Sequence, residues 1–158
     1  MDHIELDRQI SDALNLPKGS VLILTTNKHD NSLEFAYPDT LNGNLIPVNS
    51  RTIIGRAVIT KQPYISNNVQ EQRDFNFLCL FLKKNTDPAQ NMIAYPVQKM
   101  ITYPILFVDK VIAVLQILRR GYNPSETINF NKEDVEKIKS IIDDATSIRL
   151  VKSCSQAA

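Results

Sequence analysis

Two β-rich runs that follow each other almost directly constrain the fold of this chain more than any other feature. The runs are residues 101–108 and 111–118, and only Asp109-Lys110 separates them. A link this short permits antiparallel pairing alone, because a parallel pair needs a crossover of roughly a dozen residues or more. The two runs therefore predict a hairpin at the centre of an antiparallel sheet.

Helical periodicity at both ends of the chain predicts terminal helices. Apolar residues recur at helical spacing over about residues 2–15, where Asp2 is placed to cap the first turn. The clearest apolar stripe runs over about residues 131–152, with Asn131 as the expected cap and charged residues on the opposite face. Each end of the chain should therefore carry an amphipathic helix.

The middle of the chain predicts a second hairpin, a crossing helix and a long irregular excursion. Residues 20–25 and 33–37 have the pattern of two hairpin strands, and residues 51–62 have helical periodicity. A short strand is expected at residues 64–66, and residues 67–99 lose regular periodicity. This order of elements is typical of an α+β fold with an antiparallel sheet.

The totals of the sequence limit its size and its partners. With 158 residues, 43% of them hydrophobic, the chain can bury one core, so residues 1–158 are expected to form a single domain. Eighteen basic and 17 acidic residues leave a net charge of +1, which gives no strong field for nucleic acid or an anionic membrane. We expect neither as a partner.

The sequence favours a cytoplasmic location. Its N-terminus, Met1-Asp2-His3, is charged and leads into no apolar run, unlike a secretory signal. The apolar stretch over residues 105–118 is interrupted by Asp109-Lys110 and is too short to span a bilayer. The two cysteines, Cys79 and Cys154, provide no disulfide framework, which suits a reducing compartment.

Three segments carry a resemblance to the GAF domain family. Residues 52–58, Thr-Ile-Ile-Gly-Arg-Ala-Val, resemble its Gly-Ile-Ala-Gly segment, residues 102–118 resemble its paired core strands, and residues 130–134 resemble the entry to its closing helix. The resemblance covers nearly the whole chain. It implies an α+β, GAF-like fold related to PAS, with a central six-stranded antiparallel sheet. The N- and C-terminal helices would pack on one face and a ligand-type pocket would lie on the other.

The resemblance also implies a function. GAF domains bind cyclic nucleotides, bilins, haem or small metabolites, and many are sensory, regulatory domains of signal-transduction proteins. Their terminal helices dimerise and pass a conformational bias to an output domain, which requires a ligand with different affinity for two helix arrangements. We therefore expect a non-catalytic sensor, a homodimer through the terminal helices and an output domain in a longer chain. The alternative is a ligand-free module for homodimerisation or protein interaction.

Positions that match the family's ligand contacts are the candidate site. They are Ser20, Tyr37, Ile53, Ile54, Phe75, Thr102 and Gln116. Ser20 and Gln116 can hydrogen-bond the edge of a heterocycle, and Tyr37 can stack on it. The same residues also suit structural roles, because Ile53 and Ile54 would pack in any core of this kind and Gln116 can project to either face. The aromatic cluster around Phe75 fits a ligand roof, a dimer contact or core.

A motif of cyclic-nucleotide-binding GAF domains is matched only in part. It consists of an Asn-Lys pair after the second core strand and Phe-x-x-x-Asp-Glu at the last helix. Phe130 and Asp134 match, whereas Arg119-Arg120 replaces Asn-Lys and Val135 replaces Glu. The resemblance implies that Arg120 pairs with Asp134 as a structural remnant of this motif. The departures argue against a cyclic nucleotide, and the ligand stays unidentified.

Cysteines and histidines give no support to a bound chromophore, a metal or redox catalysis. Cys79 lies where bilin-binding relatives attach their chromophore, but Leu80 follows it where those relatives carry His, so a buried structural thiol is expected. Cys154 lies in the C-terminal tail, so the roof lacks the second cysteine that relatives need to reduce free methionine sulfoxide. His3 and His29 stand in polar surroundings without cysteine partners. We expect no metal, bilin or haem.

Overall fold

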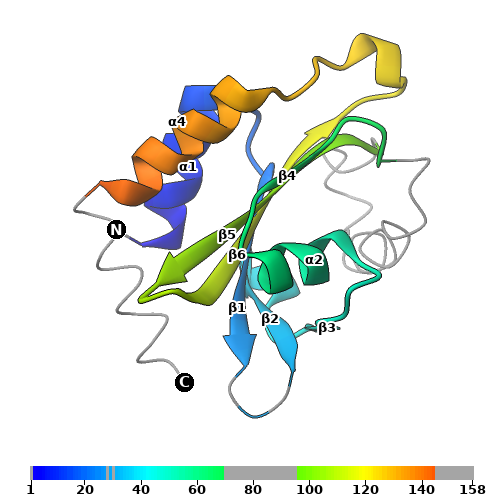
Figure 1. Cartoon of the computed structure of the whole chain (residues 1–158). Helices are drawn as coiled ribbons and strands as arrows, with labels where there is room; N and C mark the ends of the chain where they lie inside the picture. The colour runs from blue at the N-terminus through cyan, green and yellow to red at the C-terminus, as the bar shows by residue number, and fades with distance from the viewer. Residues whose placement is uncertain (1, 28, 30, 70–95, 145–158) are drawn as a thin grey trace.

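A six-stranded antiparallel sheet organises the part of the chain that the structure, a computed structural model, describes: residues 2–27, 29, 31–69 and 96–144. The strands are β1 (Val21–Asn27), β2 (Ser32–Tyr37), β3 (Leu45–Pro47), β4 (Tyr64–Ser66), β5 (Val97–Phe107) and β6 (Lys110–Arg120). Their order is β3-β2-β1-β6-β5-β4, and all neighbouring pairs are antiparallel. The predicted α+β architecture is confirmed (Figure 1).

The β5–β6 hairpin has the predicted pairing with a turn displaced by one residue. Strand β6 lies between β1 and β5, in the middle of the sheet. Phe107 pairs with Lys110, so Val108 and Asp109 form the turn. Both turn residues have positive φ angles, 49° and 62°, as tight hairpin turns require. Valine is β-branched and rarely adopts a positive φ, so its residue type favours a strand over a turn. For this reason the sequence predicted that the first strand of the hairpin includes Val108. Strand β5 also begins at Val97, within the predicted excursion.

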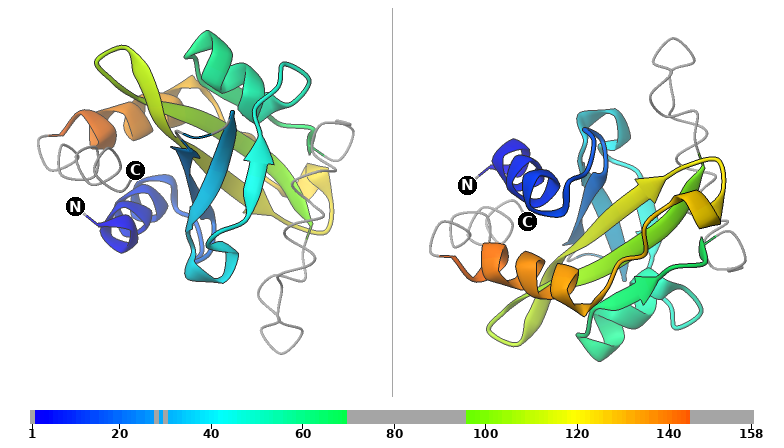
Figure 2. Two further views of the ribbon diagram at one scale, coloured as in Figure 1. Left: turned by 90° about the horizontal axis from the view of Figure 1, so that it is seen from below. Right: turned by 90° about the horizontal axis from the view of Figure 1, so that it is seen from above.

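Helices α1 (His3–Leu14) and α4 (Lys132–Asp143) lie side by side on one face of the sheet (Figures 1 and 2). Both predicted caps are present, because Glu5 N donates to Asp2 Oδ1 at 2.8 Å and Asn131 forms a capping box with Asp134. Residues 145–158, the end of the predicted closing helix, lie outside the described residues. The core of this face contains Leu6, Ile10, Leu14, Val21, Ile23, Ile101, Ile105, Ile117, Phe130, Ile138 and Ile142.

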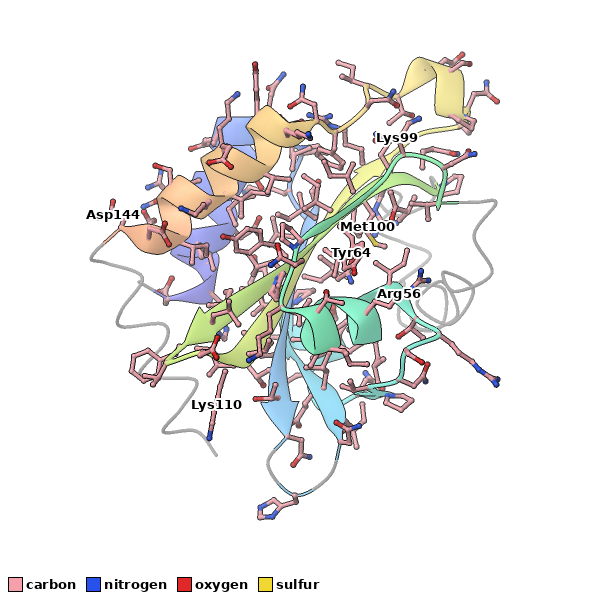
Figure 3. The ribbon with its side chains drawn as sticks, in the orientation of Figure 1. Arg56, Tyr64, Lys99, Met100, Lys110 and Asp144 are labelled. Carbon is pink, nitrogen blue, oxygen red and sulfur yellow. The ribbon has the colours of Figure 1, made fainter. Side chains whose placement is uncertain are left out.

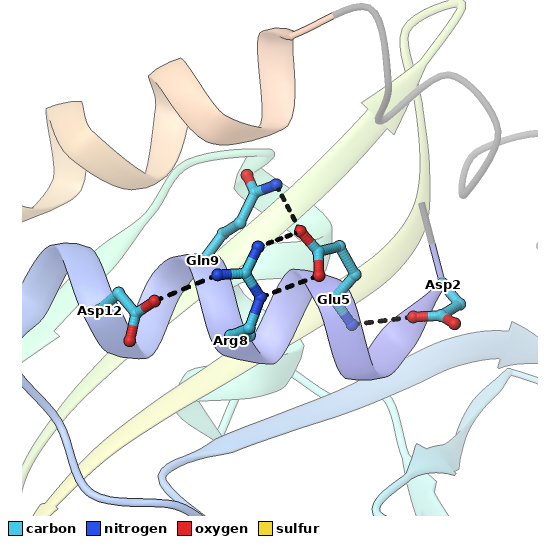
Figure 4. A network of polar contacts seen from close by, with 5 residues as sticks. All are labelled: Asp2, Glu5, Arg8, Gln9 and Asp12. Carbon is cyan, nitrogen blue, oxygen red and sulfur yellow. Dashed lines mark hydrogen bonds and ion pairs between the residues drawn. The ribbon is translucent and has the colours of Figure 1, made fainter.

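The outer face of α1 carries a network of charged and polar side chains (Figure 4). Arg8 Nε donates to Glu5 Oε2 at 2.9 Å, and Gln9 Nε2 donates to Glu5 Oε1 at 3.0 Å. The hydrogen bond from Arg8 is the main reason that the pKa of Glu5 is lowered to about 2. On this helix, Ile4 is an apolar side chain that stays 69% exposed.

Helix α2 (Ile53–Thr60) crosses the opposite face of the sheet (Figure 1). Its first turn is capped by Thr52, whose hydroxyl accepts a hydrogen bond from Gly55 N at 2.9 Å. The core beneath it contains Leu22, Leu24, Leu33, Phe35, Leu41, Ile46, Ile53, Ile54, Val69, Val97, Met100, Val114 and Leu118. Each face of the sheet therefore has its own core. None of the described helices is long and apolar enough to cross a lipid bilayer.

Candidate functional site

A row of neighbouring residues crosses four strands beneath α2 and contains two of the predicted ligand contacts. Gln116 pairs with Leu22 on one side and with Thr102 on the other, and Thr102 pairs in turn with Tyr64. Residues directly opposite each other in a sheet project to the same face. Since Leu22 belongs to the core under α2, Gln116, Thr102 and Tyr64 all project to the α2 face.

Gln116 and Thr102 form a buried polar pair in this row. Their side chains are 0% and 1% exposed, and Thr102 Oγ1 donates to Gln116 Oε1 at 3.2 Å. Within the described residues, Gln116 Nε2 has no hydrogen-bond partner. A buried amide donor without a partner costs about 1–3 kcal/mol. The pair therefore presents a donor that a further group has to satisfy.

The sheet residues next to this donor are uncharged. Met100 and Leu118 pair with each other one step along the sheet, and Ser66, which is 4% exposed, lies opposite Met100. Tyr64 and Met100 project toward α2 and Lys99 projects away from it (Figure 3). An uncharged and largely apolar surface with a few polar groups suits a neutral molecule better than an ion.

Three other predicted contacts have structural roles in this region. Ser20 Oγ donates to Pro17 O at 2.7 Å and is 3% exposed, so its hydrogen-bonding capacity serves its own turn. Ile53 and Ile54 are buried in the core under α2. Phe75 and Cys79 lie outside the described residues.

Tyr37 lies on the other side of the sheet from Gln116, contrary to the expectation from the sequence. Phe35 pairs with Leu24 and Tyr37 pairs with Ile23, so Ala36 is an extra residue in β2. This bulge turns Tyr37 to the face of the terminal helices. There its hydroxyl donates to Asp7 Oδ2 of α1. Burial, helped by that hydrogen bond, raises the pKa of Tyr37.

Tyr37 borders a cleft between α1 and the turn that follows β2. This cleft has a volume of about 780 Å³ and is lined on the α1 side by Asp7 and Ser11. Asp7 is 9% exposed and accepts hydrogen bonds from Ser11 Oγ, at 2.9 Å, and from Tyr37. The imidazole of His3 meets the Tyr37 ring edge-on at 6.2 Å. The hydroxyl of Tyr37 therefore has a hydrogen-bond partner, and these contacts join β2 to α1.

Of the two arginines in the partial motif, Arg119 is the one that contacts the segment before α4. Arg119 Nη1 donates to Ile128 O and Asn129 O at 3.1 and 3.2 Å, and Nη2 donates to Leu14 O at 3.2 Å. Its guanidinium carbon lies 4.2 Å from the centre of the Phe130 ring. Burial lowers the pKa of Arg119, and the charge of Asp134 opposes that shift.

Asp134 forms the capping box at the start of α4 together with Asn131. Its Oδ2 accepts from Asn131 N at 2.9 Å, and Asp134 N donates to Asn131 Oδ1 at 3.0 Å. Strand alternation explains why Arg119, and not the expected Arg120, faces the closing helix. Arg120 has the same parity along β6 as Gln116 and therefore projects to the α2 face. Arg119 has the opposite parity and faces the terminal helices.

Asn67 is a residue that sequence reasoning missed. Its Nδ2 donates to Phe130 O at 3.0 Å, and its Oδ1 accepts from Phe130 N at 2.9 Å, across 63 positions of sequence. Asn67 O in turn accepts from Lys99 Nζ at 2.8 Å. A polar residue after a short strand carries no sequence signal for such a contact.

The described residues show no grouping of three or more histidine, cysteine or acidic side chains that could hold a metal ion. His3 contacts Tyr37, and His29 N donates to Asn27 Oδ1 at 2.9 Å.

Comparison with known proteins identifies the fold. No family model matches the chain, and no curated protein matches it. Among solved structures, the GAF domain of a two-component sensor histidine kinase from Bacillus halodurans is 18% identical, with a TM-score of 0.60 over 96% of this chain and 97% of that one. A methyl-accepting chemotaxis protein segment, residues 122 to 287, is 21% identical, with a TM-score of 0.60 over 97% and 89%.

A third structural neighbour is an enzyme. It is a type II free methionine-R-sulfoxide reductase from Thermoplasma acidophilum, 15% identical, with a TM-score of 0.51 over 90% of this chain and 91% of that one. At such low identity these matches establish the fold alone. The chain has the GAF fold, as the resemblance implied.

Proposed function

We propose that this chain of GAF fold is a non-catalytic sensory domain that binds a small molecule over the α2 face of its sheet. The observation that carries the proposal is the buried Gln116 Nε2, which has no partner within the described residues. A ligand carbonyl oxygen or ring nitrogen that accepts this hydrogen bond would remove the cost of burying it.

The part of the ligand that reaches Gln116 is uncharged. Lys99 is the buried cation among the described residues, and it bonds Asn67 O on the other side of the sheet. A carboxylate or phosphate next to Thr102 would therefore be desolvated without a countercharge on the neighbouring sheet residues, which costs far more than a hydrogen bond returns. A nucleobase-like or amide-containing molecule fits this environment better than a small anion.

Signal transmission would use the terminal helices. Helices α1 and α4 pack on the face opposite the site, and both contact the strands that carry it. A ligand would bias their arrangement only if it bound two arrangements with different affinity. The sensor histidine kinase neighbour is a protein in which a domain of this fold belongs to a signalling chain.

The first experiment is a thermal-shift screen with nucleobases, nucleosides, cyclic nucleotides and neutral metabolites. A ligand that binds the folded state raises the melting temperature in a saturable way. The shift should be lost in Gln116→Leu, which removes the donor at similar volume. Tyr37→Phe is the matched control, because it removes one hydrogen bond on the opposite face and should leave the shift intact. If a compound raises the melting temperature of Gln116→Leu as much as that of Tyr37→Phe, Gln116 is not part of the binding site.

Two competing functions have their own tests. If no compound shifts the melting temperature and sedimentation shows a stable dimer, the chain is better explained as a ligand-free homodimerisation module. The reductase neighbour motivates an assay with free methionine sulfoxide and a thiol reductant. Turnover that disappears in Cys79→Ser would replace the non-catalytic proposal with an enzymatic one.

A further inference from the structure

Phe130, the residue before the cap of α4, is held by two strands at once. Asn67, directly after β4, pairs with both its backbone N–H and its backbone carbonyl. Arg119, near the end of β6, stacks on its ring at 4.2 Å. Phe130 is 2% exposed and its neighbour Asn131 caps the helix. The start of α4 is therefore positioned by contacts from β4 and β6.

Both of these strands also carry side chains of the α2 face. In β4, Tyr64 projects to that face opposite Thr102, three residues before Asn67. In β6, Gln116 projects to that face three residues before Arg119. In β6 the opposite parity of Gln116 and Arg119 places them on opposite faces. Asn67 follows β4 directly, so each strand connects the candidate site to a residue that contacts Phe130.

The contact between Asn67 and Phe130 is the more specific of the two. A side-chain amide that serves one backbone N–H and one carbonyl fixes both position and direction. The ammonium group of Lys99, which is 5% exposed, bonds Asn67 O and holds this residue from the sheet. Arg119 adds one hydrogen bond to Leu14 O at the end of α1, so both terminal helices meet at this junction.

We infer that the paired hydrogen bonds between Asn67 and Phe130 form a latch through which the Gln116 site on one face positions α4 on the other. The inference rests on the proposed sensory function and names its transmitting residue. Asn67 is a positioning residue and has no role in contacting a ligand. A change at Gln116 would reach β4 through its neighbours Thr102 and Tyr64, and from β4 it would reach α4 through the latch. Once the latch is removed, this route is lost and the effect on α4 should be weaker.

A double-mutant cycle on the full chain tests the latch without a ligand. Gln116→Leu changes the site, Asn67→Ala removes the latch, and amide hydrogen exchange is measured at Asp134 and Val135, whose N–H groups bond Asn131 in the first turn of α4. The factor by which Gln116→Leu alters exchange should differ by at least about twofold between the wild-type and Asn67→Ala backgrounds, as for coupled residues.

A matched control uses the same chemistry at the other edge of the sheet. Asn31 Nδ2 donates to Val48 O at 3.2 Å, and in the Asn31→Ala background Gln116→Leu should alter exchange as it does in wild type. If Asn67→Ala does not fold, Asn67→Asp keeps the acceptor for Phe130 N and loses the donor to Phe130 O. This variant should show the same loss of coupling.

Three outcomes are decisive. An equal factor in the wild-type and Asn67 variant backgrounds, or no effect of Gln116→Leu on α4 in wild type, overturns the latch. Coupling that is lost with Asn67 and kept with Asn31 supports it. The thermal-shift screen is independent of this result. If a compound binds at Gln116 but Asn67 shows no coupling to Gln116, the latch is refuted and the ligand site stands. If the coupling is present but no compound binds, the proposed ligand is refuted and the latch stands.

Discussion

Gly55 of α2 lies so close to Asn49 that a Cβ atom at position 55 would be 1.7 Å from the carbonyl oxygen of Asn49. The obstacle is backbone, which cannot rotate away as a side chain can. Gly55→Ala should therefore displace α2 or the preceding loop and lower the free energy of unfolding by about 1–3 kcal/mol. Urea denaturation measures this difference.

Gly121→Ala is the comparison for that variant. A Cβ atom at position 121 would meet Thr127 Oγ1 at 2.7 Å, an atom of a side chain that can rotate. The loss of stability should be clearly smaller than for Gly55→Ala. Equal losses would mean that the approach of Asn49 does not require glycine at position 55.

Much of the fold could be predicted because local rules and long-range structure agree. The two-residue link allowed only one way to pair β5 with β6, and Asp2 and Asn131 cap the helices they were expected to cap. The turn itself was misplaced because Val108 adopts a positive φ that its residue type disfavours.

The candidate site was predicted less well because it depends on which way each strand residue faces. Thr102 and Gln116, both candidate contacts, are hydrogen-bonded to each other, but the bulge at Ala36 turns Tyr37 to the opposite face. Strict alternation from Gln116 would have selected Arg119 over Arg120 as the partner of the closing helix. The contact between Asn67 and Phe130 joins distant loop residues, and no periodic pattern encodes it.

The Arg119 contacts predict different effects for two neighbouring arginines. Arg119→Lys loses the planar fork that reaches three backbone carbonyls and stacks on Phe130. The free energy of unfolding should fall by about 1–3 kcal/mol. Arg120→Lys, on the other face of β6, removes none of these contacts and should lower it by less than Arg119→Lys does. The reverse order in chemical denaturation would restore Arg120 as the residue that anchors the motif.

Tyr103 predicts a loss of stability at alkaline pH. Burial, with the nearby carboxylates of Asp143 and Glu136 in α4, raises its pKa to about 12. A pKa raised in the folded state gives a stabilisation that is full below the unfolded pKa of about 10 and disappears as pH rises through the folded value. Tyr103→Phe should therefore reduce the fall in unfolding free energy between about pH 10 and 12.

Comparison at two pH values isolates this effect. Near pH 7 the wild type and Tyr103→Phe should differ by less than about 0.5 kcal/mol. At high pH the free energy of unfolding should fall more steeply with pH in the wild type than in the variant. The difference between the two slopes should be less than about 1.4 kcal/mol per pH unit, the limit for one proton. Parallel slopes would show that Tyr103 titrates alike in the folded and unfolded chain.

Ile4 provides a test of homodimerisation through the terminal helices. It is 69% exposed on α1, beside the charged network around Arg8. If the outer face of α1 meets a second copy of the chain, Ile4→Lys buries a charge there and should weaken the dimer by at least about tenfold in its dissociation constant. Val108→Lys is the control, because Val108 is 79% exposed at the tip of the β5–β6 hairpin. Sedimentation velocity over a concentration series measures both. A dimer weakened by Val108→Lys and unaffected by Ile4→Lys would move the interface from the terminal helices to the hairpin.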